Sequence, residues 1–132
     1  DVICLMPTNV YGVNDNFDIN SSHVIPGLIS KFLIAKRNNT DIFVWGSGKA
    51  VREFLHVDDL ANAIFIMLTI NKVKLNKISN KKIPIFNVGS KESISIKNLA
   101  YMIKKLTKFN GKIMRKSRCL RKNPHLFELE RL

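Results

Sequence analysis

Residues 44–61 carry the sequence VWGSGKAVREFLHVDDLA, which combines two strands, a glycine turn and the start of a helix. Asp41 to Trp45 is a predicted strand, Gly46-Ser47-Gly48 a turn and Val51 to Leu55 a returning strand, so the stretch predicts a hairpin. Asp58 is the predicted cap of the next helix. The apolar positions of that helix recur at helical spacing, at Leu60, Ala63, Ile64, Met67 and Leu68.

The residues before this stretch predict a buried strand and a helix. Val2 to Met6 is an unbroken apolar run, as expected of a central parallel strand that is covered on both faces. A polar loop over Thr8 to Ser22 follows. Ser21 or Ser22 is then the predicted N-cap of a helix that runs from about Ser22 to about Arg37.

The residues after the stretch continue the alternation of strands and helices. A connection rich in Lys and Asn over 71–82 leads to a predicted buried strand from Ile83 to Val88. Ser93 or Ser95 is the predicted cap of a further helix, and Gly111 to Met114 a possible last strand. This order indicates an α/β fold. The two apolar strands need neighbours on both sides, so we expect a larger parallel sheet upstream, without which the chain should expose apolar surface and aggregate.

Composition indicates a globular domain without a membrane span. The chain has 132 residues, is 45% hydrophobic, and contains no apolar run near the ~20 residues that a spanning helix requires. The first residues lack the basic lead of a signal peptide. Cys4 and Cys119 have neither the spacing of a metal site nor a nearby partner. We therefore expect a cytoplasmic protein without structural metal.

The positive charge is concentrated in the second half of the chain. Residues 1–60 contain 5 Lys or Arg against 7 Asp or Glu, whereas residues 61–132 contain 17 against 3. Such a basic half could attract nucleic acid or the phosphates of a nucleotide. It could equally be a solvated surface of lysines around a polar loop, which we favour.

Isolated motifs do not assign a function. Gly46-Ser47-Gly48-Lys49 lacks the earlier glycine and the following Ser or Thr of a phosphate-binding loop, and no G-x-G-x-x-G occurs. His23 could be a tuned imidazole or an ordinary capping residue. Arg52 could bind a ligand or form a salt bridge, and Trp45 could stack on a base or close the core.

Four stretches together resemble one family. They are LMPTNVYGVNDNF (5–17), SSHVIPGLISKF (21–32), VWGSGKAVREFLHVDDLA (44–61), and FNVGS with SISIKNLA (86–100). In order and spacing they are similar to the second half of the GDP-L-fucose synthases, a branch of the extended short-chain dehydrogenases/reductases. The resemblance covers residues 1 to about 113. It implies the last strands of a partial Rossmann-type NAD(P)-binding fold plus the smaller C-terminal substrate-binding domain, with residues 115–132 as a diverged tail.

The resemblance also implies a reaction and a set of site residues. The family epimerises GDP-4-keto-6-deoxy-D-mannose at carbons 3 and 5 and then reduces its ketone with NADPH. By position, His23 is the epimerisation acid and also lies at the cofactor. The NADP-binding stretch corresponds to Pro7, Thr8, Asn9 and Val10. The positions that hold the GDP moiety correspond to Lys31, Trp45, Arg52 and Lys112.

The resemblance places several family residues upstream of Asp1. These are the glycine-rich cofactor loop, the catalytic serine, the Tyr-x-x-x-Lys pair and the cysteine partner of the epimerisation. We therefore expect this chain to be inactive alone and the complete enzyme to be a homodimer. Two alternatives stay open: another extended short-chain epimerase or dehydratase that acts on a UDP or dTDP sugar, and, less favoured, a nucleic-acid-binding module without catalysis.

Overall fold

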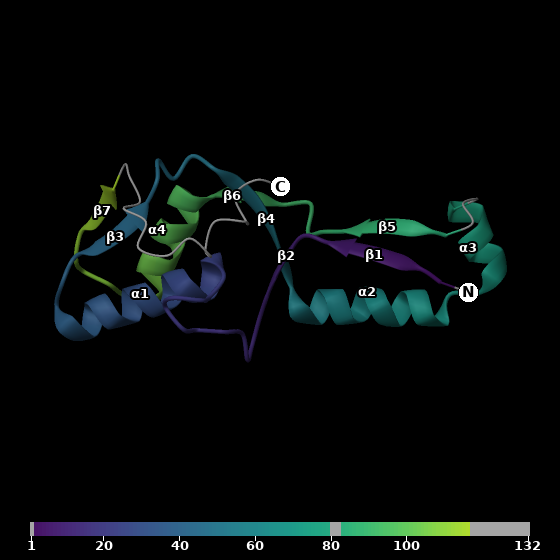
Figure 1. Ribbon diagram of the computed structural model, residues 1–132, viewed down its shortest axis with the longest axis horizontal. Coiled ribbons are helices and arrows are strands. Elements are labelled where there is room, and N and C mark those ends of the chain that lie inside the picture. The colour runs from purple at the N-terminus through teal and green to yellow at the C-terminus, as the bar shows by residue number, and fades with distance from the viewer. Residues whose placement is uncertain (1, 80–82, 117–132) are drawn as a thin grey trace. The chain divides into compact units, whose positions relative to one another are not determined.

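The protein is described by a computed structural model that defines residues 2–79 and 83–116 (Figure 1). The chain forms two compact units, each built from two separate segments. Unit 1 consists of Asp1–Asn14 and Arg52–Ser93, and unit 2 consists of Asp15–Val51 and Ile94–Leu132. The predicted diverged tail, including Cys119, lies outside the described residues apart from its first two positions.

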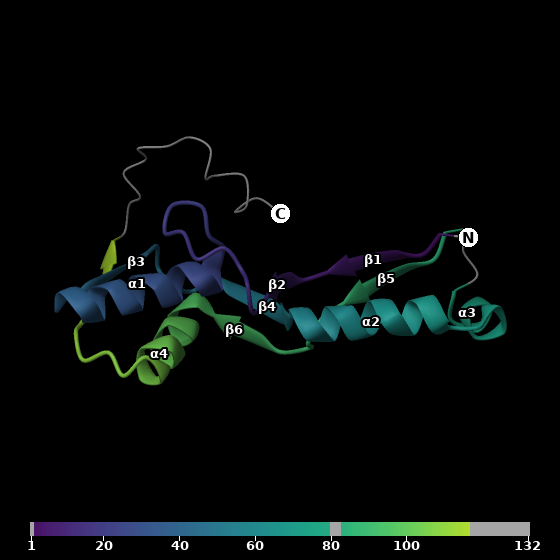
Figure 2. The same ribbon diagram turned by 90° about the horizontal axis from the view of Figure 1, so that it is seen from below.

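Unit 1 contains parallel strand pairs and two helices. Its elements are β1 (Cys4–Pro7), β2 (Asn9–Tyr11), β4 (Val51–His56), α2 (Val57–Thr69), α3 (Lys72–Ile78) and β5 (Ile85–Val88). β1 pairs in parallel with β5, and β2 pairs in parallel with β4. Figure 2 shows β1 and β5 side by side, with α2 running back along them.

Unit 2 is a helix pair against a parallel strand pair. Its elements are α1 (Val24–Asn38), β3 (Ile42–Trp45), β6 (Ser93–Ser95), α4 (Ile96–Leu106) and β7 (Ile113–Lys116). β3 pairs in parallel with β7. The packed core lies here: Phe32 of α1 is fully buried and meets Phe109 edge to face, with 5.4 Å between the ring centroids. Burying a phenylalanine contributes roughly 1.5–3 kcal/mol, so this contact is a main source of the unit's stability.

Local sequence explains where the helices of unit 2 begin and end. The Ser95 hydroxyl accepts a hydrogen bond from the Asn98 amide at 3.1 Å, which confirms Ser95 as the cap of α4. α1 ends at Asn38 and is capped by Asn39, whose left-handed backbone (φ 50°) lets its amide donate to the carbonyl oxygens of Ala35 and Lys36. Asparagine tolerates this conformation better than most residues, so it stops the helix.

The predicted hairpin is wrong. β3 and β4 lie in different sheets, because the linker between them binds α4 rather than closing a ladder. Within it, Gly46 and Gly48 adopt positive φ angles of 73° and 70°. The carbonyl oxygens of Gly48 and Ala50 then accept hydrogen bonds from the first amides of α4 at 2.9 Å. The partner of β3 is consequently β7, which arrives after α4.

Two predicted caps and one predicted loop also need correction. α1 begins after His23, not after Ser21 or Ser22, and α2 is capped by His56 rather than by Asp58. The lysine-rich connection contains α3, because Asn71 caps it by accepting from the Lys74 amide at 2.8 Å. The short strands β2 and β6 were not predicted, because three residues are too few to show a periodicity.

The strands expected to be buried are partly exposed. Val2 is 67% exposed and Met6 54%, and Ile85 of β5 is 53% exposed. No residue of α2 is buried, although most of its side chains are apolar. The α/β class and the parallel pairing are as predicted, and unit 1 shows the exposed apolar surface that the sequence led us to expect.

Candidate functional site

The loop after β1 provides the first group of candidate residues. Pro7 ends β1, and the Thr8 amide donates to the Val88 carbonyl oxygen at 3.0 Å, at the carboxyl ends of β1 and β5. The Thr8 hydroxyl is buried but has no hydrogen-bond partner among the described residues. Buried hydroxyl groups are nearly always paired, and ligands of α/β sheets bind at the carboxyl ends of strands. A polar group of a bound ligand would therefore supply the hydrogen-bond partner that the Thr8 hydroxyl lacks among the described residues.

Backbone contacts fix the next residues of this loop. The Asn9 side-chain amide donates to the Glu53 carbonyl oxygen at 3.0 Å, and Val10 lies opposite Leu55 in the β2–β4 pair. The Glu53 carboxylate accepts from the Lys91 amide at 2.7 Å. A Cβ atom at Gly89 would collide with that carboxylate, so glycine is required there. Within unit 1 the loop is thus hydrogen-bonded to β5 through Thr8 and to β4 through Asn9.

His56 was missed by the sequence analysis, although it organises the end of β4. Its Nδ1 atom accepts from the Asp58 amide at 3.3 Å, and its ring meets Tyr11 edge to face with 5.3 Å between centroids. A Cβ atom at Gly12 would collide with Val57. The NVYG and HVDD segments therefore pack against each other. Histidine is an infrequent cap, so the more typical Asp58 was chosen from sequence.

Arg52, the predicted guanidinium contact, lies in β4 of unit 1. Its side chain is half-buried and interacts with neighbouring residues. His23, Lys31, Trp45 and Lys112 belong to unit 2. Their convergence with Arg52 on one nucleotide stays a prediction.

His23 is the N-cap residue of α1, and its exposed imidazole makes no capping hydrogen bond. Its carbonyl oxygen accepts from the Gly27 amide at 2.9 Å, which is the first bond of the helix. A Cβ atom at Gly27 would approach the Ser22 hydroxyl to 2.7 Å, so the chain passes the helix closely. This arrangement fixes the backbone of His23 and leaves its imidazole available at the positive end of the helix dipole.

A turn centred on Asp18 leads the chain into His23. One Asp18 carboxylate oxygen accepts from the Asn20 amide at 2.7 Å and from the Ser21 amide at 3.1 Å. Together with a bond that the Ser21 hydroxyl donates at 3.2 Å, they lower the pKa of Asp18 below its ordinary value of 3.8, the Asn20 amide having the largest effect and the Ser21 hydroxyl the next. The Ser30 hydroxyl of α1 donates to the Phe17 carbonyl oxygen at 2.7 Å. The turn is therefore anchored to the helix that carries His23.

Lys31 and Trp45 are the two predicted substrate residues that the structure brings together. The Lys31 ammonium group lies 4.5 Å from the centroid of the Trp45 ring, within the range of a cation–π contact. Trp45 remains 54% exposed at the end of β3. An ammonium group and a half-exposed indole at one place can bind a phosphate and stack on a ring.

Lys112 lies at the other end of the same strand pair. Its amide donates to the Asp41 carboxylate at 2.8 Å, and its carbonyl oxygen accepts from the Ile42 amide at 3.0 Å. In the register of this pair Lys112 lies four residues from the position opposite Trp45, which corresponds to about 13 Å along the strands. Arg115 is closer to Trp45 in the register, since it lies opposite Val44, and the sequence analysis missed it.

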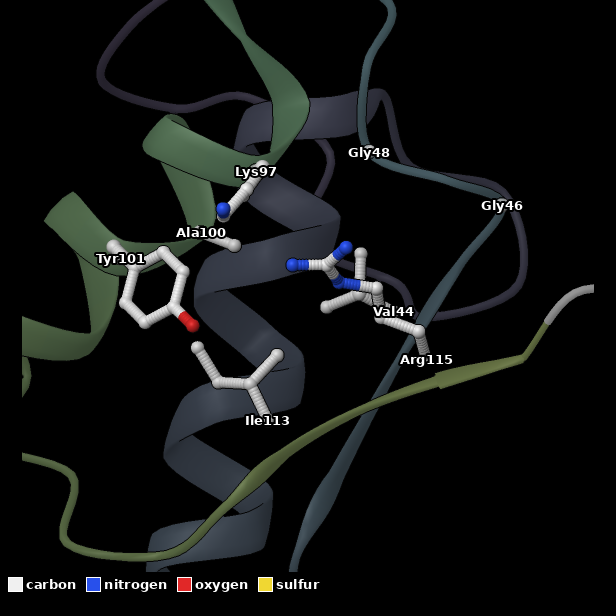
Figure 3. Close-up of a pocket in the computed structure, with 8 residues that line it drawn as sticks. All are labelled: Val44, Gly46, Gly48, Lys97, Ala100, Tyr101, Ile113 and Arg115. Atoms are coloured by element: carbon white, nitrogen blue, oxygen red, sulfur yellow. The ribbon is translucent and has the colours of Figure 1, made fainter.

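A small pocket opens beside the turn that follows Trp45 (Figure 3). Its apolar wall is formed by Val44, Ala100 and Ile113, while the polar ends of Lys97, Tyr101 and Arg115 point toward it. Its volume of about 10 Å³ has room for about one water molecule and is too small for a nucleotide.

Tyr101 and Lys105 have the Tyr-x-x-x-Lys spacing of the family's pair. They lie on α4 of unit 2, after β5, whereas the resemblance places the family's pair before Asp1. We therefore give this pair no role in the proposed reaction.

Among residues 2–79 and 83–116, no group of three or more His, Cys, Asp or Glu side chains could hold a metal ion. No helix in that same part of the chain is both long and apolar enough to cross a bilayer.

Comparison with known proteins identifies relatives of this chain. The model of the NAD dependent epimerase/dehydratase family matches residues 1–89. GDP-L-fucose synthase 1 of Arabidopsis thaliana is 42% identical over 114 residues, and GDP-L-fucose synthase of Escherichia coli is 41% identical over 116. Each match covers 86% of this chain, but only 32% and 36% of the relative. The chain thus spans about a third of the length of these relatives.

Comparison with solved structures also finds enzymes named for GDP-sugars. The GDP-L-fucose synthetase of Naegleria fowleri bound to NADP is 31% identical with a TM-score of 0.73, over 85% of this chain and 32% of that one. A GDP-D-glycero-L-gluco-heptose synthase of Campylobacter jejuni with NADPH is 31% identical with a TM-score of 0.75, over 87% and 43%. These matches confirm the predicted partial Rossmann-type fold.

Proposed function

Because the chain belongs to the NAD dependent epimerase/dehydratase family, we propose that it forms the substrate-binding part of an NADP-dependent GDP-sugar epimerase/reductase. The complete enzyme would be a GDP-L-fucose synthase that converts GDP-4-keto-6-deoxy-D-mannose into GDP-L-fucose. The observation that carries the proposal is the contact between Lys31 and Trp45. The relatives quoted above act on GDP-sugars by name, which supports the choice of nucleotide.

In this proposal the Lys31–Trp45 pair receives the GDP moiety. The Lys31 ammonium group is a point charge suited to a phosphate, and Trp45 presents an open aromatic face for stacking. Arg52 and Lys112 add positive charge. Lys112, about 13 Å from Trp45 along the strands, would meet the opposite end of an extended nucleotide diphosphate.

The loop Pro7, Thr8, Asn9 and Val10 would receive the nicotinamide end of NADP. The buried Thr8 hydroxyl without a partner fits a polar group of the cofactor, and the Asn9 contact with β4 keeps the loop in place. When bound, NADPH supplies the hydride that reduces the ketone at carbon 4. The loop residues of this chain would orient the cofactor, while the family's Tyr-x-x-x-Lys pair would come from the upstream part.

His23 would act in the epimerisation. The hydrogen atoms on carbons 3 and 5 are acidic because they neighbour the ketone, so a base removes each as a proton and leaves an enolate. His23 then donates a proton to the same carbon from the other face, which inverts its configuration. The position of His23 at the amino end of α1 also favours negative charge on the enolate oxygen.

A fused protein tests the proposal. This chain is joined behind the part of the E. coli GDP-L-fucose synthase that precedes the matched segment. We expect GDP-L-fucose formation, and we expect His23→Gln to lower it about 100-fold or more while GDP binding is retained. Equal product from both proteins would remove His23 from the reaction. Calorimetry should show tighter binding of GDP than of UDP, and a preference for UDP would favour the alternative nucleotide-sugar enzymes.

A complete enzyme of this kind would be a cytoplasmic homodimer that needs neither a membrane nor nucleic acid. The basic residues 61–132 would then form a solvated surface. Sedimentation of the fused protein tests the dimer. Salt-dependent retention of DNA or RNA would instead support the nucleic-acid alternative.

A further inference from the structure

Three donor side chains meet at the small pocket beside the turn Gly46–Gly48, and the proposed function uses none of them. They are Lys97 and Tyr101 of α4 and Arg115 of β7 (Figure 3). All residues that line the pocket belong to unit 2, and no Asp or Glu is among them. Two positive charges therefore lie at one pocket whose lining contains no acidic side chain to balance them.

The backbone explains why these side chains gather. Lys97 and Tyr101 are four residues apart on α4, so they lie one turn apart on the same face of the helix. Arg115 lies opposite Val44 in the parallel β3–β7 pair, and residues opposite each other point to the same face of a sheet. Because Val44 is buried and lines the pocket together with Ala100 of α4, Arg115 extends on the side of β7 that faces α4.

The turn at the rim of the pocket is fixed against the first turn of α4. The carbonyl oxygen of Gly48 accepts from the Lys97 amide, and that of Ala50 from the Ile96 amide, both at 2.9 Å. A Cβ atom at Gly48 would lie 3.1 Å from the Lys97 Cβ atom, so the backbone passes close to this side chain. These amides are thus occupied, and the donors that remain at the pocket belong to side chains.

Most of the donor capacity of the three side chains is not used by the protein itself. In the described part of the chain, the Lys97 ammonium group and the Tyr101 hydroxyl group have no hydrogen-bond partner. The Arg115 Nη1 atom donates to the Ser47 carbonyl oxygen at 3.5 Å, which is long for such a bond. A guanidinium group has several further N–H donors. The pocket therefore offers an ammonium group, a guanidinium group and a phenol hydroxyl to one ligand.

We propose that this pocket is an accessory binding site for a phosphate group. Phosphate oxygens are strong acceptors, and arginine can bind two of them at once, while lysine adds a point charge. The volume of about 10 Å³ admits an atom the size of one water oxygen, so one phosphate oxygen enters and the rest of the ligand stays at the mouth. The site thus fits inorganic phosphate or the terminal phosphate of a small ester.

This site is separate from the proposed GDP site. Trp45 follows Val44 on β3, and successive side chains of a strand point to opposite faces. Val44 is accordingly buried at the pocket, whereas Trp45 is 54% exposed. The inference therefore does not rest on the proposed function, and a variant of Lys31 separates the two.

Phosphate titration of the 132-residue chain, followed by NMR at constant ionic strength with chloride as the balancing anion, tests the site. We expect saturable shifts of the Gly46 and Gly48 amides and of the Arg115 Nε–H resonance. Arg115→Gln should weaken phosphate binding roughly 10-fold or more, because it removes hydrogen bonds between charged groups. Tyr101→Phe removes only a hydroxyl group from a half-exposed ring, so it should keep the fold and weaken binding about 2- to 10-fold.

A pair of lysine variants distinguishes a site from general positive charge. Lys97→Gln and Lys105→Gln remove the same charge from α4, but Lys105 does not line the pocket and lies eight residues from Lys97, about 12 Å along the axis. We expect roughly 10-fold weaker phosphate binding for Lys97→Gln and about threefold or less for Lys105→Gln. Equal weakening by both, or shifts that never saturate, would overturn the proposal.

Two other ligands define the group that is bound. Saturable binding of inorganic phosphate or of glycerol phosphate supports the site, and the tighter of the two identifies the form that it takes. Acetate that binds as tightly as phosphate would overturn the assignment to a phosphate group.

Lys31→Met separates this site from the GDP site. It should leave the phosphate shifts unchanged, because the Lys31 ammonium group lies at the Trp45 ring. Loss of the shifts in this variant would place the phosphate at the proposed GDP site and overturn a separate one. Absence of GDP binding in the fused protein, with the phosphate shifts retained, would refute only the proposed function.

Discussion

Replacement of Lys31 by methionine tests the proposed GDP site in two separate measurements. The substitution keeps the aliphatic stem but removes the ammonium group that lies 4.5 Å from the Trp45 ring. Trp45 is the only tryptophan, so the fluorescence of the 132-residue chain reports on this contact directly. The contact contributes about 0.5–1 kcal/mol. We expect Lys31→Met to change the emission of Trp45 and to increase its quenching by neutral acrylamide, because the ring loses the ammonium group that lies over it.

The second measurement is GDP binding by calorimetry in the fused protein. A hydrogen bond to a charged group contributes about 1.5–3 kcal/mol, so losing the Lys31 contact with a phosphate should weaken GDP binding roughly 10- to 150-fold. Arg37→Met is the matched control, since it removes one positive charge from the same helix. Arg37 lies six residues further on, about 9 Å along the axis, where salt at physiological strength screens much of its effect. We expect a change of about twofold or less.

The comparison of the two variants decides the outcome. Equal weakening by Lys31→Met and Arg37→Met would mean that GDP responds only to overall charge, and the reasoning from the Lys31–Trp45 contact would be refuted. Unchanged fluorescence in Lys31→Met would show that the contact itself does not form.

Three further predictions concern side chains that stabilise unit 2. Phe32→Ala should lower the free energy of unfolding by about 3–5 kcal/mol in urea, whereas Leu33→Ala, at a half-exposed neighbour, should change it by about 0.5 kcal/mol or less. Ser95→Ala should cost about 1 kcal/mol through loss of the α4 cap, and Ser93→Ala much less, measured in the same titrations; equal losses would contradict the capping role. Because the pKa of Asp18 is lowered in the folded chain, its contribution is complete above pH 3.8 and is lost as the pH falls through the folded-state value. The amide resonances two and three residues later should follow this titration by NMR, and Asp18→Asn should abolish it.

The sequence predicted best those features that depend on local chemistry. Ser95 was one of two serines predicted to cap α4, because a serine hydroxyl can reach an amide three residues on, and α1, α2 and α4 were predicted from apolar spacing. The predicted hairpin was wrong because the partner of a strand depends on residues that are distant in the sequence. Nothing in Gly46 to Ala50 alone reveals that their carbonyl oxygens bind the start of α4.

The site could be predicted only in part for the same reason. Lys31 and Trp45 were chosen by resemblance, and their contact required the packing of α1 near β3. The role of His56 was missed because imidazole rarely caps a helix, and the unpartnered Thr8 hydroxyl becomes evident only once burial is known. Pairing and burial are properties of the folded chain, so residue type alone did not reveal them.

The interleaving of the two units has a practical consequence for dissecting this protein. The backbone passes from one unit to the other after Asn14, Val51 and Ser93. A single cut after Val51 therefore leaves both units incomplete, a cut after Asn14 or Ser93 still divides one of them, and neither unit can be obtained as one continuous stretch. Isolation of unit 2 requires removal of 1–14, excision of 52–93 and a short engineered bridge between Val51, the first residue of β4, and Ile94 of β6.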